Sequence, residues 1–496
     1  MVTGLRLGVA GILSVLFFLM LSVYPLQHLP LFEYAYDWRR ILELTILSVT
    51  AIWLLLDLSL RQQWLECYQQ IPRLARIGIL IFFGLGLISS VLAPLPQFAL
   101  MQVGMYGLLW MTTLTIAALR VIYGQAFDRW ILAVLMVMCG CYGFYLLLTD
   151  IQLWFFAAGQ GMGSVEFQYA LLAPSFMNIR FFANVISFSL PLIVLPSLLY
   201  RHHPRLLRWV YFAVSAIWWY ALILNHCQTL WLEWVVIPIF TFIWFRAEGF
   251  VWLKQQVKAA VGGLVLYVLL TAIIPWLLNI AVTTAVLAGS SDGRLPLWWY
   301  TLKMIVHHPL LGVGPLHFAY YVNEKLPLAH PHNSILLIAA EWGIPAMLML
   351  LSLVLWGLVG WVKRYPLLKG VGVERVKYIA LSAAFLGGAI DSLLSGVIVM
   401  PLSQAMLVLV VGWMFGFYQS EKKHDTIVVV KAHTWFMAAL LIALALLWHG
   451  VYPLILHLPQ QVMIYIQEGC GGVYDSSCAI SPSFWTQGWI KYYVAS

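Results

Sequence analysis

The chain has 496 residues, of which 63% are hydrophobic and only 9% are charged. Soluble domains carry about 25% charged residues, so this composition excludes an ordinary soluble protein. Apolar runs of about 20 residues recur between short basic connections, which is typical of a polytopic helical membrane protein. The runs do not alternate as the strands of a transmembrane barrel would. Basic residues in those connections explain the net charge of +8 better than nucleic-acid binding does.

We therefore predict an all-α polytopic membrane protein with about thirteen spans and a cytoplasmic N-terminus. The first apolar run follows Arg6 but lacks a small-residue cleavage site, which favours a span over a signal peptide. The predicted spans are 7–24, 41–60, 77–93, 98–119, 130–149, 181–200, 209–224, 230–245, 260–281, 334–358, 378–395, 404–418 and 435–452.

The basic residues set the predicted orientation. Most of the 27 Lys and Arg residues fall on the same side as the N-terminus, which the positive-inside rule assigns to the cytoplasm. The predicted external segments are 25–40, 150–180, 226–229, 282–333 and 453–496. The cations on that side need a reason other than topology; they are Arg39, Arg40, Arg180, Arg294, Lys303, Lys325 and Lys491.

This topology divides the chain into four regions. They are an N-terminal transmembrane bundle (1–281), a large external loop (282–333), a C-terminal transmembrane bundle (334–452) and an external tail (453–496). The tail contains Cys470 and Cys478, which an oxidising compartment such as the periplasm would allow to form a disulfide. No cysteine spacing indicates a zinc site or a redox dithiol.

The large loop begins with a predicted helix. Ser291 or Asp292 can cap it, and Pro296 falls near its first turn. Apolar residues then recur at spacings of three and four, which predicts an amphipathic helix at a membrane interface. One interpretation is an interfacial belt with snorkelling cations at Arg294 and Lys303. The other is that Arg294 binds an anionic headgroup, since a guanidinium holds phosphate oxygens bidentately.

Two further motifs follow in the same loop. Gly312 and Gly314 permit a tight turn whose amides either face an anion or belong to a plain connector. His330, His332 and Asn333 precede a predicted span, at a helix N-terminus that favours an anion and disfavours imidazolium. A neutral histidine there can act as a general base towards a hydroxyl. The alternative is a capped helix start with bystander histidines.

A metal site of His317, His330 and His332 is a weaker alternative, because no carboxylate or cysteine joins them at a familiar spacing.

Upstream, Arg180 lies at the external mouth of a predicted span, where a cation is costly without an anionic partner. Structural pairing is expected for the acidic residues placed deepest in the spans, with a proton relay as the alternative; they are Glu43, Glu233 and Asp391.

Several of these motifs occur together. They are Arg294, Trp298, His308-Pro309-Leu310-Leu311-Gly312-Val313-Gly314, His330-Pro331-His332-Asn333 and Glu341-Trp342-Gly343. In this combination they resemble the signature of the O-antigen ligase and Wzy polymerase superfamily. The HPHN and EWG motifs are closer to its protein O-oligosaccharyltransferase branch. Pilin-glycosylating members of that branch are also similar over Asn178-Ile179-Arg180-Phe181-Phe182-Ala183-Asn184 and Leu190-Pro191-Leu192.

The resemblance implies a GT-C-type transferase in the bacterial inner membrane, with its site facing the periplasm and with no metal or other cofactor. The donor would be a glycan on undecaprenyl diphosphate. The acceptor would be a Ser or Thr hydroxyl of an exported protein such as a type IV pilin.

The resemblance also implies roles for residues of this chain. His332 would be the catalytic base, while Arg294 and Arg180 would bind the diphosphate. The other candidate substrate contacts are His330, Asn333, Lys303, His317, Gly312 and Gly314. Many superfamily members carry a Ser-Arg pair where this chain has His226-Cys227-Gln228-Thr229, which leaves the exact set of cations open.

Two alternatives to a protein acceptor keep the same fold. They are ligation to the lipid A core, as in O-antigen ligases, and addition to a growing glycan, as in the polymerases. A transporter of lipid-linked glycans is an alternative from another class. Transporters place their polar groups near the bilayer midplane, whereas the predicted polar cluster lies in an external loop.

Overall fold

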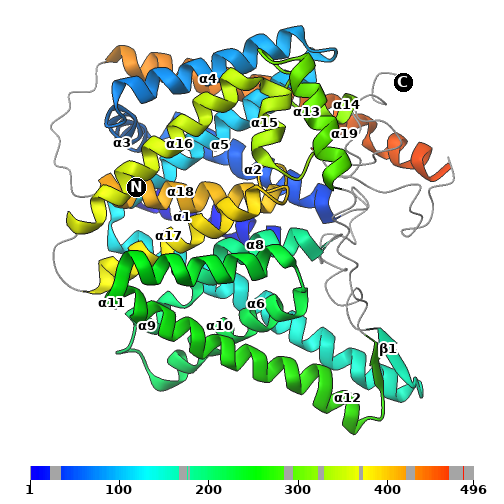
Figure 1. Ribbon diagram of the computed structural model, residues 1–496. Coiled ribbons are helices and arrows are strands. Elements are labelled where there is room, and N and C mark those ends of the chain that lie inside the picture. Colours follow the sequence, from blue (N-terminus) through cyan, green and yellow to red (C-terminus); the bar gives the residue numbers. More distant parts are fainter. Residues whose placement is uncertain are drawn as a thin grey trace.

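The computed structural model describes residues 2–22, 35–166, 176, 179–283, 294–321, 329–367, 372–419, 430–467 and 484. Of these described residues 86% are helical, which confirms the predicted all-α polytopic class (Figure 1). Within the described ranges the only sheet is a parallel pair of short strands, β1 (Ser164–Glu166) and β2 (Ala281–Thr283).

Helices follow the apolar runs closely, because a backbone in lipid must satisfy its polar groups internally. In chain order the elements are α1 (Val2–Leu21), α2 (Ala35–Leu56), α3 (Leu58–Gln69), α4 (Arg73–Leu92), α5 (Pro96–Tyr123), α6 (Gln125–Gly159), α8 (Ile179–Ile193), α9 (Leu195–Leu199), α10 (Arg205–Asn225), α11 (Gln228–Val268), η2 (Leu269–Ile273), α12 (Ile274–Leu277), α13 (Arg294–His307), α14 (Phe318–Tyr321), α15 (Ser334–Trp342), α16 (Ile344–Arg364), η4 (Tyr365–Leu367), α17 (Gly372–Ser392), α18 (Pro401–Gln419) and α19 (Val430–Gln467).

Fewer helices qualify as spans than the thirteen predicted. In the described part of the chain nine are long and apolar enough to cross a membrane, or ten if the bent pair of α2 and α3 is one span. The difference between ten and the thirteen predicted spans has three physical reasons. The apolar part of α1, Arg6–Leu21, is short. α17 carries charged residues towards both of its ends, and two predicted spans are joined in α11.

α11 folds back on itself at Arg246. This residue has a left-handed φ of 48° between two helical stretches. The ring centroids of Trp234 and Trp252 are only 6.2 Å apart. Eighteen residues of straight helix would separate them by about 27 Å. The predicted spans 230–245 and 260–281 are therefore two arms of one hairpin (Figure 1).

Two other boundaries differ from the prediction. The predicted span 334–358 is divided at Gly343 into α15 and α16. Gly343 has a φ of 88°, and a Cβ there would lie 2.3 Å from the carbonyl oxygen of Leu310. α19 continues to Gln467, so it extends well beyond the predicted span 435–452 into the region assigned to the tail.

The described parts of the five predicted external segments lie at one end of the bundle, on the right in Figure 1. Arg40 on α2 donates to the carbonyl oxygen of Phe484 in the tail at 2.9 Å. β1, after α6, pairs with β2, after α12. Cys227 lies close enough to Arg294 to act on it electrostatically. The predicted alternation of the spans agrees with this arrangement, and the assignment of this end to the periplasm stays a prediction.

The opposite end carries the predicted cytoplasmic connections, which are joined by ion pairs. Arg6 contacts Asp57 at 2.6 Å, linking the start of α1 to the break between α2 and α3. Asp128 on α6 contacts Arg120 at 2.5 Å and Lys377 at 2.7 Å. These pairs satisfy charges that would otherwise be buried alone.

The backbone at Gly343 gives a prediction about stability. Gly343→Ala forces an L side chain into a left-handed conformation against Leu310, so it should lower the free energy of unfolding by about 1–3 kcal/mol. Gly357→Ala is the matched control, because a Cβ there meets nothing within 4 Å and alanine favours helix. Thermal unfolding in detergent compares them, and equal effects would contradict the role of Gly343.

Candidate functional site

α8 brings a stripe of polar side chains to the end of the bundle where the predicted external segments meet. Arg180, Asn184 and Ser187 are four and three residues apart, so they lie on one face of the helix. Ser187 Oγ donates to Glu233 Oε1 at 2.9 Å and lies 3.4 Å from Asp391 Oδ2. The deep acids Glu233 and Asp391 are thus joined through one hydroxyl rather than separately paired.

Asn184 ties α8 to the C-terminal end of α17. Its buried side-chain amide lies 2.9 Å from Ser395 Oγ. With its nitrogen as donor, the amide also reaches Asp391 Oδ2 at 2.8 Å and the carbonyl oxygen of Arg180 at 2.9 Å. Asn184 therefore holds the backbone that carries Arg180.

The histidine loop (residues 329–333) precedes α15. His332 has a left-handed φ of 51°, which turns its amide back so that it donates to His330 Nδ1 at 3.2 Å. The two imidazole centroids are 4.2 Å apart. His330 is buried, whereas His332 is partly exposed. Of the two, His332 is the side chain that a substrate can reach.

Two arginines converge on this loop, one from α8 and one from the first turn of α13. Both Arg180 and Arg294 act electrostatically on His332, and Arg180 acts on Arg294. Partial burial, followed by the like charge of Arg180, lowers the pKa of Arg294 below its usual value. Asp391 and Cys227 oppose that shift. The structure thus brings together the three residues that the sequence nominated as catalytic.

The histidines are held in their neutral form. Burial lowers the pKa of His330 to about 4. Burial also lowers the pKa of His332 well below its usual value, and the charges of His330, Arg180 and Arg294 act in the same direction. A neutral imidazole beside two cations is able to accept a proton from a hydroxyl, which an imidazolium cannot do.

Asn333 and Trp298 hold the loop in place. The Asn333 side-chain oxygen accepts from the Leu336 amide at 2.9 Å, which makes Asn333 the N-cap of α15. Its Nδ2 donates to the carbonyl oxygen of Leu393 at 3.0 Å. Trp298 Nε1 donates to the carbonyl oxygen of Pro331 at 2.9 Å. Both polar ends of Asn333 are therefore used within the protein.

The glycine turn is a packing element, as in the connector interpretation. The Val313 amide donates to the carbonyl oxygen of Ala340 at 2.8 Å, and the Gly314 amide donates to that of Glu341 at 3.0 Å. The Gly312 amide is used within the turn. A Cβ on Gly312 would lie 2.4 Å from the Glu341 backbone. The amides of Val313 and Gly314 therefore point at α15, and that of Gly312 points at the carbonyl oxygen of His308.

The Glu341-Trp342-Gly343 motif completes this packing. The Phe318 amide donates to Glu341 Oε1 at 3.1 Å. The ring of Trp342 stacks between Phe82 at 4.7 Å and Tyr106 at 5.7 Å, measured between centroids. The motif thus fixes α15 against α4, α5 and the loop before α14.

His317 and Lys303 lie apart from the histidine loop. His317 is buried, accepts from the Leu95 amide at 3.0 Å through Nε2, and donates through Nδ1 to the Pro315 carbonyl oxygen at 2.8 Å. Burial lowers its pKa to about 4, so it is a neutral packing residue. Lys303 is exposed on α13, with Nζ 5.5 Å from the ring centroid of Trp299.

α13 accommodates both interpretations of its sequence. One face, with Leu297, Thr301, Met304 and Ile305, is buried. The opposite face exposes apolar residues; they are Leu295, Trp299, Leu302 and Val306. Lys303 lies over Trp299 as an interfacial, snorkelling cation would. Arg294, at the helix start, belongs to the site instead.

In the described ranges, no group of three or more His, Cys, Asp or Glu side chains is arranged to hold a metal ion. Several residues singled out in the sequence lie outside the described residues; they are Cys470, Cys478, Lys325, Ser291 and Asp292.

The sequence did not indicate that Cys227 and Arg40 are neighbours of the site. For Arg40 a signal existed, since it is a cation on the side of the membrane that disfavours cations.

The fold and the site define a polytopic membrane protein with an arginine-flanked histidine loop at one end of its helices. Residues 211–351 match the family model described as O-antigen ligase, a range that runs from α10 into α16 and includes α13 and the histidine loop. This match supports the O-antigen ligase and Wzy polymerase superfamily, which the motifs predicted. No curated protein matches the chain. The family indicates a glycan-transferring ligase that uses a lipid-linked glycan donor and an acceptor.

The dual engagement of Asn333 gives a test of the loop. Asn333→Ala removes the α15 cap and the bond to Leu393, so it should cost about 1–2 kcal/mol of stability. Asn333→Asp retains the capping oxygen but loses the donor to Leu393, so it should recover only part of that loss. Thermal unfolding of the two variants in detergent is the measurement, and an Ala variant as stable as the wild type would contradict the capping role.

Proposed function

We propose that this protein transfers a glycan en bloc from undecaprenyl diphosphate to a Ser or Thr hydroxyl of a periplasmic protein such as a type IV pilin. The observation that carries the proposal is the convergence of Arg180 and Arg294 on the neutral histidine pair. A diphosphate bound between the two arginines would offset their mutual repulsion, because each guanidinium can hold phosphate oxygens bidentately. The proposed site faces the periplasm from the bacterial inner membrane.

In the proposed reaction, Arg180 and Arg294 bind the diphosphate while the polyprenyl chain lies among the spans. His332 takes the proton of the acceptor hydroxyl as its oxygen attacks the anomeric carbon of the glycan. The bond between that carbon and the diphosphate oxygen breaks, and the arginines stabilise the charge on the leaving group. No step requires a metal ion, so we propose a metal-independent enzyme.

The acceptor decides between this proposal and its alternative. The Asn-Ile-Arg-Phe-Phe-Ala-Asn motif favours a protein acceptor, whereas the family description favours the lipid A core. In vitro transfer from a defined undecaprenyl-diphosphate glycan should modify a pilin and leave lipid A core unmodified, with EDTA present. Modification of the core alone would establish an O-antigen ligase instead.

Substitutions at the site separate the roles of its residues. His332→Ala removes the base, which typically contributes about 10²–10⁴-fold, and Arg294→Ala removes an electrostatic donor worth about 10²–10³-fold. Both should abolish detectable glycosylation of a co-expressed acceptor while the protein remains in the membrane. Lys303→Ala, on the same helix as Arg294, should retain activity because Lys303 lies over Trp299. Full activity of His332→Ala would contradict the assignment of the base.

The low pKa of His332 gives a pH dependence. A histidine base works when neutral, so activity falls as the pH drops through its pKa. With an ordinary pKa of about 6.5, only about 3% of the histidine would be neutral at pH 5. Because burial lowers the pKa of His332, kcat/KM for the donor should fall much less between pH 7 and pH 5 than it would with an ordinary histidine. An acid limb centred near pH 6.5 would contradict a base whose pKa is lowered.

A further inference from the structure

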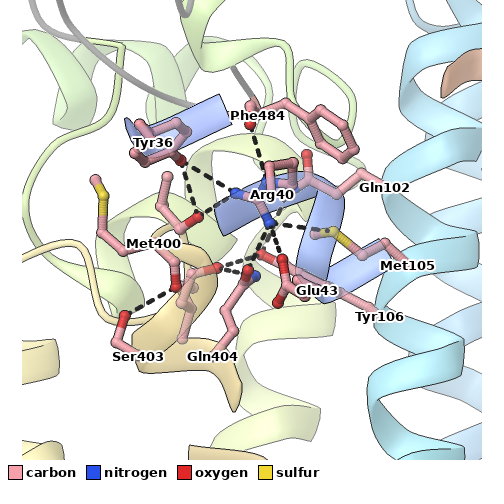
Figure 2. A network of polar contacts seen from close by, with 12 residues as sticks. Tyr36, Arg40, Glu43, Gln102, Met105, Tyr106, Met400, Ser403, Gln404 and Phe484 are labelled. Atoms are coloured by element: carbon pink, nitrogen blue, oxygen red, sulfur yellow. Dashed lines mark hydrogen bonds and ion pairs between the residues drawn. The ribbon is translucent and has the colours of Figure 1, made fainter. Parts of the chain in front are cut away.

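A buried network of polar contacts surrounds Arg40 at the start of α2 (Figure 2). Arg40 is only 1% exposed. Its Nη1 donates to Glu43 Oε2 at 2.5 Å and to Gln404 Oε1 at 2.7 Å. Its Nη2 donates to the Tyr36 hydroxyl at 3.1 Å. A cation this deep is costly, and Glu43 supplies the opposing charge.

The same guanidinium also binds two backbone carbonyl groups from distant parts of the chain. Nη2 donates to the Val399 carbonyl oxygen at 2.5 Å, and the Tyr36 hydroxyl reaches that oxygen at 3.4 Å. Nε donates to the Phe484 carbonyl oxygen at 2.9 Å. Arg40 therefore uses all three of its nitrogens, and only the planar fork of arginine reaches so many acceptors at once.

Val399 belongs to the segment that joins α17 to α18, residues 393–400. The amides of Val399 and Met400 both donate to the Gly396 carbonyl oxygen at 2.9 Å, which makes the segment a compact turn. A Cβ on Gly396 would lie 2.8 Å from Cε1 of His330. The segment is thus packed directly against the buried imidazole.

The segment touches the histidine loop at a second point, because Asn333 Nδ2 donates to the Leu393 carbonyl oxygen at 3.0 Å. The loop is therefore seated on the segment through His330 and Asn333, on either side of His332. Arg40 and His330 also line one small cavity together with Gln102 and Glu341. The volume available there is about 10 Å³, which is room for one water molecule.

The other side of the network is apolar. Glu43 lines a cavity of about 260 Å³ that lies among α1, α2, α5, α6 and α18 and is walled mostly by aliphatic and aromatic side chains. The ion pair of Arg40 and Glu43 thus separates a polar space under the histidine loop from an apolar space at membrane depth.

We propose that Arg40 is a positioning residue for His332, acting through the 393–400 segment and His330. The proposal rests on the transferase function proposed above. Arg40 contacts no substrate; it holds the surface on which the base is seated. A displacement of a catalytic group by about 1 Å can cost about 10²-fold in rate.

Arg40→Lys tests this, because lysine keeps the charge and loses the fork. The matched control is Arg61→Lys at the opposite end of the bundle. Arg61 also donates to backbone carbonyl oxygens, of Leu54 at 3.3 Å and Leu55 at 3.0 Å, and lies 3.3 Å from the Met437 sulfur. Reconstituted enzyme is assayed with an undecaprenyl-diphosphate glycan and a pilin acceptor.

We expect Arg40→Lys to lower kcat by about 10- to 100-fold with the donor KM unchanged, because the arginines that bind the diphosphate are untouched. The acid limb of kcat/KM should move towards pH 6.5 as the loosened loop admits water around His332. The charged and titratable groups around the loop and its arginines are Arg180, Arg294, Glu341, Arg40, Glu43, Asp391, Cys227 and His330. Arg40→Lys leaves the number of charges in this set unchanged.

Hydrogen–deuterium exchange gives a readout without activity. Exchange of a peptide covering residues 330–337 should rise in Arg40→Lys and not in Arg61→Lys, since the His332 amide is bonded to His330. If Arg40→Lys does not accumulate, Tyr36→Phe removes the hydroxyl between Arg40 and Val399 and should give the same changes, smaller.

The positioning role would be overturned if kcat, the pH profile and loop exchange of Arg40→Lys equalled those of the wild type. The same holds for Tyr36→Phe where that variant is used instead. The changes expected for Arg40→Lys would also overturn the role if they appeared in Arg61→Lys. Failure of the wild-type enzyme to transfer any glycan would instead contradict the proposed function. In that case, unchanged exchange of residues 330–337 in Arg40→Lys would still overturn the link between Arg40 and the histidine loop.

Discussion

The electrostatic constraint at the end of α8 governs the rest of this structure. Arg180 and Arg294 come from different parts of the chain, yet each acts on the same histidine. Like charges that act on the same side chain also repel each other, and the low dielectric of a membrane protein strengthens the repulsion. The scaffold must therefore hold both cations in place against this repulsion. This preorganisation is what a lipid-linked diphosphate donor would use.

The scaffold meets this requirement with backbone fixed by polar side chains. Asn184 holds the backbone of Arg180, Asn333 and Trp298 hold the histidine loop, and Arg40 holds the turn beneath it. Each of these contacts joins segments far apart in sequence. The site is thus built where the predicted external segments meet, at the ends of helices that are themselves apolar and separated along the chain.

The sequence predicted the helical class and the approximate spans, because apolar runs are local signals, while the catalytic roles of His332, Arg294 and Arg180 stay predictions. It could not separate candidates that contact substrate from those that pack. The glycine turn and His317 illustrate this, since their amides and ring nitrogens bond to backbone groups that no motif reveals. The hairpin at Arg246 and the break at Gly343 depend on single backbone angles, which hydropathy does not report. Arg40 was only an unexplained cation, because its partners lie on α5, α18 and the tail.

The most direct test of the account follows the donor instead of the acceptor. Purified protein in vesicles is given undecaprenyl-diphosphate glycan labelled in both the glycan and the diphosphate, together with a pilin acceptor. We predict that free undecaprenyl diphosphate appears in equal amounts with protein-linked glycan, and that both disappear with His332→Ala. Movement of intact donor across the membrane without release of the diphosphate would contradict a transferase and indicate a transporter.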